Sequence, residues 1–478
     1  MTPSAPHDPV GAPRPLVLEH ARAEIRRLRA EAGRRIAVLD DDPTGSQTVH
    51  AVEVVTVLDE AEYAAALADP GSTAFILTNT RSLAEHSAVE VTGDVAHALF
   101  RLGERQGFPV DVVSRSDSTL RGHVLAEIRA IDAAQRAVTG SGFDGILLAP
   151  GYFDAGRVTS GDVHWARDGD ALVPVGETEF ATDATFGYRS SDLKEFLSEK
   201  SGGSVASHEV RSIGLEDIRV GGPERVTQIL EDVSDGAFVV VNGTEYSDYE
   251  IVVLGLLRAE AAGKTFLHRT GPSFVRALAG IEPRAPLTAA DIWPSGGPSG
   301  HGLIVIGSHV GLTSRQVGAA QQRCGVPDVE LDVPTLLDPQ RRDEHIAEVG
   351  ARLAEALRLS SVMLFTSRAV RQGSDADDSL AISRSVSSAV VEVVRAALPA
   401  RPGWVLAKGG ITSHDVAVHG LGIRRAQVLG QLFPGVVSVL EPVEAAAGAV
   451  GVPYVVFAGN VGDENTLADI IESFSQGS

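Results

Sequence analysis

The sequence predicts an α/β protein with two domains, each built on a mainly parallel sheet. The length of 478 residues exceeds what a single hydrophobic core usually organises. Short, continuous runs of Val, Ile and Leu recur along the chain, and each ends in polar or Gly-rich residues. Such runs are typical of strands buried on both faces of a parallel sheet. Ala-, Glu- and Leu-rich segments with helical spacing separate them, and this alternation defines the α/β class.

The first domain is expected over residues 21–287, after a tail over 1–20 whose Pro-, Ala- and Gly-rich composition predicts disorder. A basic segment with helical spacing leads into the domain. Helices are expected over 59–68 and 87–104. The expected strands, each with its polar turn, are IAVLDDDPTG (36–45), AFILTNTRSL (74–83), VDVVSRSDSTLRG (110–122) and GILLAPGYFDAGR (145–157).

The second domain is expected over residues 303–478. The segment TAADIWPSGGPSGHG, 288–302, is rich in Pro, Gly and Ser and predicts a linker between the domains. The strand–turn–helix rhythm then resumes in GLIVIGSHVGLTSRQ (302–316), SVMLFTSR (361–368), WVLAKGGITSHD (404–415) and YVVFAGNVGDENTL (454–467).

Charge and cysteine content exclude several classes of partner. The formal net charge of −22 argues against nucleic acid and against an anionic membrane, since both require a basic face. No apolar stretch approaches the roughly 18 residues of a membrane span, and the N-terminus has no secretory pattern. Cys324 is the only cysteine, so no intrachain disulfide forms and a reducing compartment is expected. These features predict a cytoplasmic protein.

Ligands of open α/β sheets bind beyond the carboxyl ends of the strands. That rule gathers the polar turns of the first domain at one edge, where arginines can grip an anion in a bidentate way. A polyhydroxylated, anionic small molecule is therefore the expected ligand. His164 could touch it, although a lone histidine is more often structural. The residues of this first edge are Asp40, Asp41, Asp42, Arg81, Arg115, Ser116, Asp117, Ser118, Thr119 and Arg121.

The second domain has glycine turns, GSHVG, KGGIT and AGNVG, each between an apolar run and an expected helix. Free N–H groups and the helix dipole favour phosphate at such turns, so they predict nucleotide binding. If the two edges face each other, they enclose a ligand cleft between the domains. The chain contains no GxGxxG with a following acidic residue, HExxH, paired CxxC or GxSxG motif.

Two other functions remain open at this point. Asp40, Asp42 and Thr44 fit the DxDxT signature of haloacid-dehalogenase-like phosphohydrolases, with Asp40 as nucleophile and Asp42 as acid/base. That interpretation leaves SRSDSTLRG and KGGITSHD unexplained. A non-catalytic sugar-acid-binding protein is the other alternative, although such a sensor usually carries an additional DNA-binding or partner module.

Taken together, these segments resemble the four-carbon acid sugar kinase family, from about Ile36 to Leu467. The resemblance implies a sugar-acid-binding N-terminal domain, a nucleotide-binding C-terminal domain, and ATP-dependent phosphorylation of a threonate, erythronate or 3-oxo-tetronate. The matching landmarks are DDDPTG, TNTRS, SRSDSTLRGH, APGYFDAGRVTSGDVH, ETEFATD, IGSHVGLTSRQ, KGGITS, FPGV and AGNVGDENTL.

By motif, the resemblance assigns sugar-acid binding to the Asp41–Asp42 pair, Arg81 and residues 115–118. It assigns nucleotide binding to Ser308, Gly409, Gly410, Ile411, Thr412 and Gly459.

Phosphoryl transfer depends on positioning and charge neutralisation. We therefore expect Arg81 and Arg115 or Arg121 to hold the substrate carboxylate, and Asp117 and Ser118 to bind its hydroxyls. Asp42 or Asp41 would accept the proton of the attacking hydroxyl, and crowding of the aspartates would raise one of their pKa values. A further aspartate would help hold Mg²⁺ through water.

The chain departs from the family pattern at Ile411, where relatives often carry an acidic residue, at Phe457, where many have lysine, and at His309. The stereoisomer, the phosphorylated hydroxyl and the oligomeric state, for which a homodimer is one option, are not set by the motifs.

Overall fold

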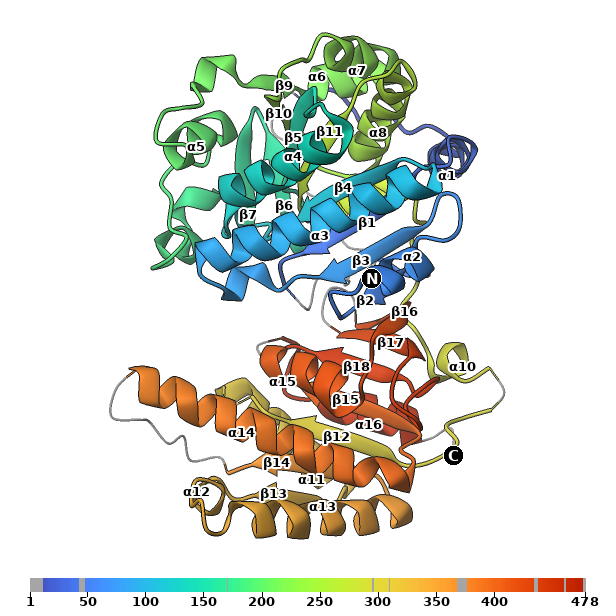
Figure 1. Cartoon of the computed structure of the whole chain (residues 1–478), viewed down its shortest axis with the longest axis vertical. Helices are drawn as coiled ribbons and strands as arrows, with labels where there is room; N and C mark the ends of the chain where they lie inside the picture. The colour runs from blue at the N-terminus through green and yellow to red at the C-terminus, as the bar shows by residue number, and fades with distance from the viewer. Residues whose placement is uncertain are drawn as a thin grey trace. The chain divides into compact units, whose positions relative to one another are not determined.

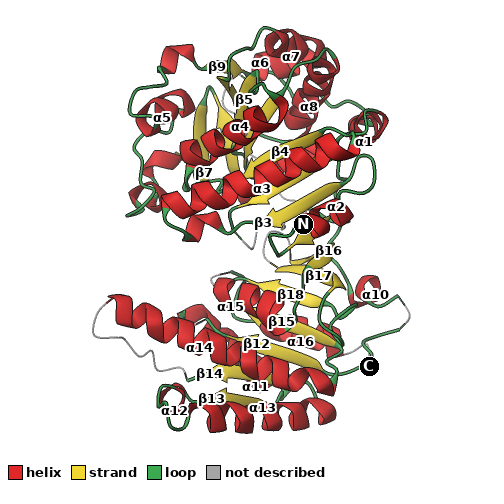
Figure 2. Cartoon of the chain, viewed as in Figure 1, coloured by secondary structure: helices red, strands yellow, loops and turns green. Residues whose placement is uncertain are grey.

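A computed structural model of the chain divides into two compact units, Met1–Pro283 and Arg284–Ser478. Both alternate strands with helices (Figures 1 and 2), and most strands pair in parallel, which confirms the predicted α/β class with mainly parallel strands. The ligand cleft expected between the domains is not tested by either unit taken alone and stays a prediction. The structure describes residues 12–42, 48–169, 171–294, 296–308, 310–367, 376–433, 437–459 and 461–475.

The main sheet of the first unit is parallel throughout its described strands, in the order β2-β3-β1-β4-β11-β5-β10-β9. A smaller antiparallel sheet, β6-β7-β8, follows β5 in the chain. The strands are β1 (Arg35–Asp40), β2 (Glu53–Val55), β3 (Thr73–Leu77), β4 (Val110–Arg115), β5 (Gly145–Ala149), β6 (Arg157–Ser160), β7 (Val163–Asp168), β8 (Ala171–Pro174), β9 (Arg211–Ile213), β10 (Ala237–Val241) and β11 (Phe266–Thr270).

Helices α3 and α4 pack against each other over this sheet, and α8 packs against α1, α7 and α9. Apolar positions of α3, such as Val95 and Leu99, point into the same core as Ile128 of α4. The helices are α1 (Ala21–Glu31), α2 (Glu60–Ala66), α3 (Glu85–Gln106), α4 (Val124–Thr139), α5 (Leu193–Lys200), α6 (Leu215–Arg219), α7 (Gly222–Glu231), α8 (Tyr246–Ala261) and α9 (Pro272–Leu278).

The second unit has a parallel part, β13-β14-β12-β15-β18, continued by the antiparallel strands β17 and β16. Its strands are β12 (Gly302–Ile306), β13 (Asp328–Leu331), β14 (Val362–Thr366), β15 (Trp404–Lys408), β16 (Arg425–Phe433), β17 (Val437–Glu444) and β18 (Tyr454–Phe457), and its helices are α10 (Ala289–Ile292), α11 (Gly311–Cys324), α12 (Val333–Leu336), α13 (Arg342–Leu359), α14 (Ala376–Ala397), α15 (Gly410–Asp415) and α16 (Thr466–Ser475).

The segment 288–302, expected to be a linker, lies inside the second unit. Thr288 caps α10 through Asp291, and Ile292 is buried in the core of this unit. The ring of Trp293 packs edge-on against Phe474, with 4.8 Å between centroids. Ile292 and Trp293 pack against the core of the second unit although glycine and proline are frequent in the residues that follow them. The unit therefore begins at Arg284, ahead of the predicted start at residue 303.

Most of the tail expected over residues 1–20 lies outside the described residues. The described part contacts the first unit, since Arg219 Nη1 donates a hydrogen bond of 2.7 Å to the carbonyl of Pro13. Among the described residues, no helix combines the length and the apolar character that crossing a bilayer requires.

A buried ion pair fixes the start of α8. The Nε and Nη2 atoms of Arg219 donate to the two oxygens of Asp248 at 2.8 Å each, and both side chains are fully buried. Asp248 also accepts hydrogen bonds from the backbone N–H groups of Thr244 and Glu245. It therefore caps α8, in whose first turn it lies.

We expect Asp248→Ala to lower the free energy of unfolding by about 3–5 kcal/mol, because it leaves the buried Arg219 charge without its carboxylate. Thermal unfolding followed by circular dichroism measures this. The control is Glu224→Ala, which removes an exposed pair with Arg258 and should cost less than about 1 kcal/mol. Equal shifts for both variants would contradict the prediction.

Candidate functional site

The polar residues of the first unit meet where β1, β3 and β4 end. In the parallel register, Asp40 lies opposite Leu77 on one side and Arg115 on the other. The chain therefore leaves all three strands at one edge, as expected for ligand sites in such sheets. The Asp41 N–H still bonds the carbonyl of Arg115 at 3.3 Å, and the N–H of Thr78 bonds that of Asp40 at 3.0 Å.

Arg81 joins the turn after β3 to the aspartates after β1. Its Nε donates to Asp41 Oδ2 at 3.2 Å, and its Nη2 bonds Asp41 Oδ1. Its Nη1 donates to Asp42 Oδ2 at 3.1 Å. Asp41 is almost fully buried, whereas the Asp42 side chain remains 31% exposed. The structure thus brings together three of the residues that sequence reasoning placed at this edge, and of the two aspartates Asp42 is the one that faces solvent.

Asp40 is buried beneath this pair. Its Oδ1 accepts a hydrogen bond of 2.7 Å from Arg115 Nη1, and its Oδ2 has no hydrogen-bond partner among the described atoms. Burial raises the pKa of Asp40 to about 7, because the charge of Arg115 offsets the desolvation only in part. Burial also raises the pKa of Asp41, against the effect of Arg81. The expected rise is therefore present, but burial contributes more to it than crowding does.

The position of Asp40 weakens the phosphohydrolase alternative. A carboxylate with no solvent-exposed surface, held by a buried arginine, cannot reach an external phosphate. Thr44, the third member of the DxDxT pattern, lies outside the described residues.

The turn after β4 supplies a second acidic group. Arg121 Nε donates to Asp117 Oδ2 at 2.7 Å, and the hydroxyl of Thr119 bonds the same oxygen. Burial would raise the pKa of Asp117, but the charges of Arg81 and Arg121 outweigh it and lower the pKa to about 2. Asp117 is therefore ionised at neutral pH and accepts hydrogen bonds. Ser116 is buried, and its N–H donates to the carbonyl of Thr270 at 3.0 Å.

Sequence reasoning missed a fourth strand end at this edge, that of β11. Arg269 of β11 donates to Ser114 Oγ at 2.6 Å and also bonds Glu127 of α4. A Cβ atom on Gly122 would lie 3.2 Å from both Arg269 Nη2 and Asp41 Oδ2, so only glycine leaves these groups undisturbed. The signal was present in the apolar run FLHRT, 266–270, which ends in Arg and Thr.

His164 has the structural role expected of a lone histidine. It is fully buried on β7, where its Nε2 lies 2.8 Å from the carbonyl of Ser118 and its Nδ1 lies 2.9 Å from Thr159 Oγ1. Burial lowers its pKa to about 4, so the ring is neutral at neutral pH. Arg157, which the sequence interpretation also passed over, donates to Ser118 Oγ at 2.7 Å.

In the second unit, the glycine turns after β12, β15 and β18 converge. A Cβ atom on Gly307 would lie 1.9 Å from Thr412 Oγ1, and one on Gly459 would lie 2.6 Å from Ser308 Oγ. Gly409 has a φ of 121°, and a Cβ atom on it would lie 3.3 Å from the backbone nitrogen of Ser308 and 3.2 Å from Thr412 Oγ1. The predicted residues Ser308, Gly409, Thr412 and Gly459 therefore share one location.

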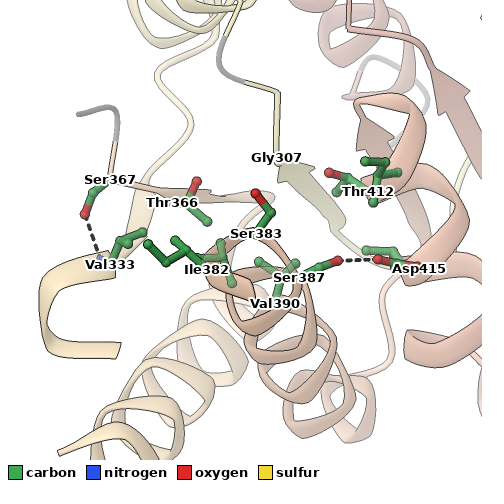
Figure 3. A pocket seen from close by; sticks show the side chains of 13 residues that line it. Gly307, Val333, Thr366, Ser367, Ile382, Ser383, Ser387, Val390, Thr412 and Asp415 are labelled. Atoms are coloured by element: carbon green, nitrogen blue, oxygen red, sulfur yellow. Dashed lines mark hydrogen bonds between the residues drawn. The ribbon is translucent and has the colours of Figure 1, made fainter. Parts of the chain in front are cut away.

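A pocket of about 220 Å³ lies next to these turns (Figure 3). It is mainly apolar, with hydroxyl groups of Thr366, Ser383 and Thr412 around it. Ser387 of α14 hydrogen-bonds Asp415 of α15 at one side. Ile411 also lines the pocket.

The departures from the family pattern fall in this region. Ile411 is 75% exposed, in the first turn of α15 beside the pocket. Phe457 is buried at the end of β18, under Lys408. Gly410 begins the short helix α15. His309 lies outside the described residues.

Lys408 is a buried cation beneath the glycine turns. Its Nζ donates to the carbonyl of Ala458 at 3.0 Å and lies 3.5 Å from the centroid of the Phe457 ring. No carboxylate of the described residues pairs with it, and burial lowers its pKa to about 7. Between pH 7 and the ordinary lysine pKa, the unfolded chain therefore binds more protons than the folded chain, so this group favours folding as the pH rises.

We expect Lys408→Met to be more stable than the wild type at pH 7, because it removes a buried charge. That advantage should shrink steadily up to pH 9.5, because the free energy needed to remove the proton of the unfolded lysine falls as the pH rises. Melting temperatures of both proteins across this range measure the effect. A difference that does not change with pH would show that Lys408 does not titrate as described.

Comparisons with known proteins agree with this geometry. Residues 36–278 match a family model described as a sugar-binding N-terminal domain, and residues 303–467 match one described as a nucleotide-binding C-terminal domain. A curated relative, the D-erythronate kinase of Heliobacterium modesticaldum, is 24% identical over 285 residues. That alignment covers 59% of this chain and 58% of the relative, so it spans less than two thirds of the relative's length.

Solved structures share the fold at low identity. The Haemophilus influenzae protein HI1011 superposes with a TM-score of 0.62 at 16% identity, over 92% of this chain and 99% of the other. A crystal structure from Salmonella typhimurium LT2 reaches a TM-score of 0.67 at 17% identity, with the same coverage. The sugar-binding model alone covers just over half of the sequence and the nucleotide-binding model covers most of the second unit, and the chain therefore belongs to the four-carbon acid sugar kinase family.

Proposed function

We propose that this protein transfers the γ-phosphoryl group of ATP to a hydroxyl of a four-carbon sugar acid of the threonate, erythronate or 3-oxo-tetronate class. The observation that carries the proposal is the convergence of Gly307, Gly409 and Gly459 around Ser308, beside a largely apolar pocket. The relative described as a D-erythronate kinase supports the class of acceptor.

The second unit fits the nucleotide. Backbone N–H groups can approach phosphate oxygens only where no side chain intervenes, and a Cβ atom at Gly307 or Gly459 would meet Thr412 or Ser308. We assign the phosphates to Ser308, residues 409–412 and Gly459, and the adenosine to the adjoining pocket. The exposed Ile411 then covers an apolar face of the base, which needs no acidic side chain at that position.

The first unit supplies the acceptor side. Asp42 is the aspartate of this edge that keeps an exposed carboxylate, and Arg81 fixes its orientation. We assign to Asp42 the acceptance of the hydroxyl proton as the new oxygen–phosphorus bond forms and the bond to the ADP oxygen breaks. Asp41 holds Arg81 in place, and the ionised Asp117 accepts hydrogen bonds from other substrate hydroxyls.

ATP chemistry usually requires Mg²⁺, which keeps several waters and is bound by one or two carboxylates together with the phosphates. The described residues contain no group of three or more His, Cys, Asp or Glu side chains placed to share a metal ion. A magnesium ion would therefore arrive with the nucleotide, and a carboxylate of the first edge other than the proton acceptor would help hold it through water.

The direct test is ADP release with ATP and Mg²⁺ across D- and L-threonate, D- and L-erythronate and their 3-oxo forms. We expect Asp42→Asn and Asp41→Asn to abolish turnover with the best acid while ATP binding is largely kept. Asp94→Asn, on the exposed side of α3, should behave as the wild type. Wild-type rates in both site variants would remove these aspartates from catalysis, and no ADP release with any acid would refute the proposed function.

Gly307→Ala should weaken ATP binding at least 10-fold, because the new methyl group displaces Thr412 from the glycine turns. Isothermal titration of the full-length protein with ATP and Mg²⁺ measures this. The control is Gly318→Ala in α11, where a Cβ atom meets nothing within 4 Å. Unchanged affinity in Gly307→Ala would place the phosphates elsewhere.

A further inference from the structure

Three arginines at the edge of the first unit already have carboxyl groups as partners. Sequence reasoning gave them the task of holding the carboxylate of the substrate. An arginine that is fully paired attracts a further anion less than one whose charge is uncompensated. The pairs are Arg81 with Asp41 and Asp42, Arg115 with Asp40, and Arg121 with Asp117 and Asp183.

Arg157 differs from these three. It begins β6, and its Nη1 donates a hydrogen bond of 2.7 Å to Ser118 Oγ. No acidic side chain of the described residues forms an ion pair with it. Its guanidinium carbon instead lies 5.4 Å from the centroid of the Phe180 ring and 5.9 Å from that of Tyr152. Burial lowers the pKa of Arg157, as expected of a cation that lacks a close counter-ion.

The surroundings hold this guanidinium in one place. The backbone N–H and carbonyl of Arg157 both bond Tyr152, each at 2.9 Å. Ser118, which accepts the hydrogen bond of the Arg157 side chain, is itself held in place because the neutral His164 ring donates a hydrogen bond to its carbonyl. Phe180 lies beside both Arg157 and Arg121, with the latter 5.1 Å from its centroid. The site is therefore preorganised, which lowers the cost of binding an anion.

Arg157 also lies near the proposed catalytic aspartates. Its partner Ser118 follows Asp117 directly in the chain, in the turn after β4, at the edge where Arg81 holds Asp42. Arg121, which donates to Asp117, lies beside the same Phe180 ring as Arg157. A short hydroxy acid can place its carboxylate at Arg157 and its reactive hydroxyl toward Asp42.

We propose that Arg157, together with Ser118, binds the carboxylate of the acceptor and makes this enzyme selective for acids over neutral polyols. The inference rests on the proposed kinase function and changes one part of it, since Arg81, Arg115 and Arg121 then act by positioning the aspartates. A guanidinium offers a carboxylate two parallel hydrogen bonds, which a neutral alcohol end group cannot accept in the same way.

The test compares wild type, Arg157→Met and Arg157→Lys with erythronate and threonate as acids and erythritol as the neutral analogue. In Arg157→Met we expect KM for the acid to rise about 10- to 100-fold, with a smaller change in kcat, and the preference for acid over erythritol to disappear. Arg157→Lys keeps the positive charge but cannot donate two parallel hydrogen bonds. Its KM for the acid should therefore lie between those of the wild type and Arg157→Met. The affinity for ATP, measured by titration calorimetry, should not change in either variant.

The control is Arg167→Met, which removes an exposed arginine from β7 of the same small sheet. It should keep the wild-type KM and the preference for acid. An Arg157→Met protein that still prefers the acid overturns the inference but leaves the kinase proposal intact. If Arg157→Met does not fold, an Arg157→Lys protein with unchanged KM overturns it equally. A wild-type protein that releases ADP with none of the four-carbon acids, the 3-oxo forms included, refutes the proposed function and this inference with it.

Discussion

The ion pair between Arg81 and the two aspartates after β1 is the interaction on which the first unit's site depends. It ties the turn after β3 to the turn after β1, at an edge that the parallel register has already aligned. The same pair fixes how much of each carboxylate remains accessible, because Asp41 is enclosed while Asp42 faces outward. Burial of Asp40 beneath it explains a carboxyl pKa near 7 in a group that takes no part in the proposed proton transfer.

The proposed site of the second unit depends on glycine turns and not on charged side chains. In the proposed phosphate site, backbone N–H groups must approach phosphate oxygens, and glycine at the ends of three strands leaves these groups uncovered by a side chain of their own. The distances from hypothetical Cβ atoms at Gly307 and Gly459 to Thr412 and Ser308 show that these turns are closely packed already. Lys408 adds a cation beneath them without a carboxylate partner among the described residues. A phosphate bound there would supply the negative charge that the buried Lys408 lacks.

Arginines that pair with aspartates and the arginine that does not have different proposed roles at the first edge. In the sequence all of them have the same chemistry, and their number alone suggested an anion site. The structure separates them: an arginine that meets an aspartate becomes a positioning group, whereas Arg157 meets a serine and aromatic rings. The difference arises because β6 and β7 form a hairpin that brings residues 157 and 164 to Ser118, although they are far from it in the sequence.

The sequence by itself determined the α/β class, the existence of two domains, and the polar and glycine turns that end the strands. These features are local, since a continuous apolar run predicts a buried strand and the residues after it necessarily lie at its end. Only the tertiary structure decided that Arg269 and Arg157 join the first edge, that Asp40 is enclosed, and that Ile292 and Trp293 make residues 288–302 part of the second unit. Strand order, burial and ion-pair partners depend on contacts between distant segments, and no local pattern encodes which partner each charged side chain meets.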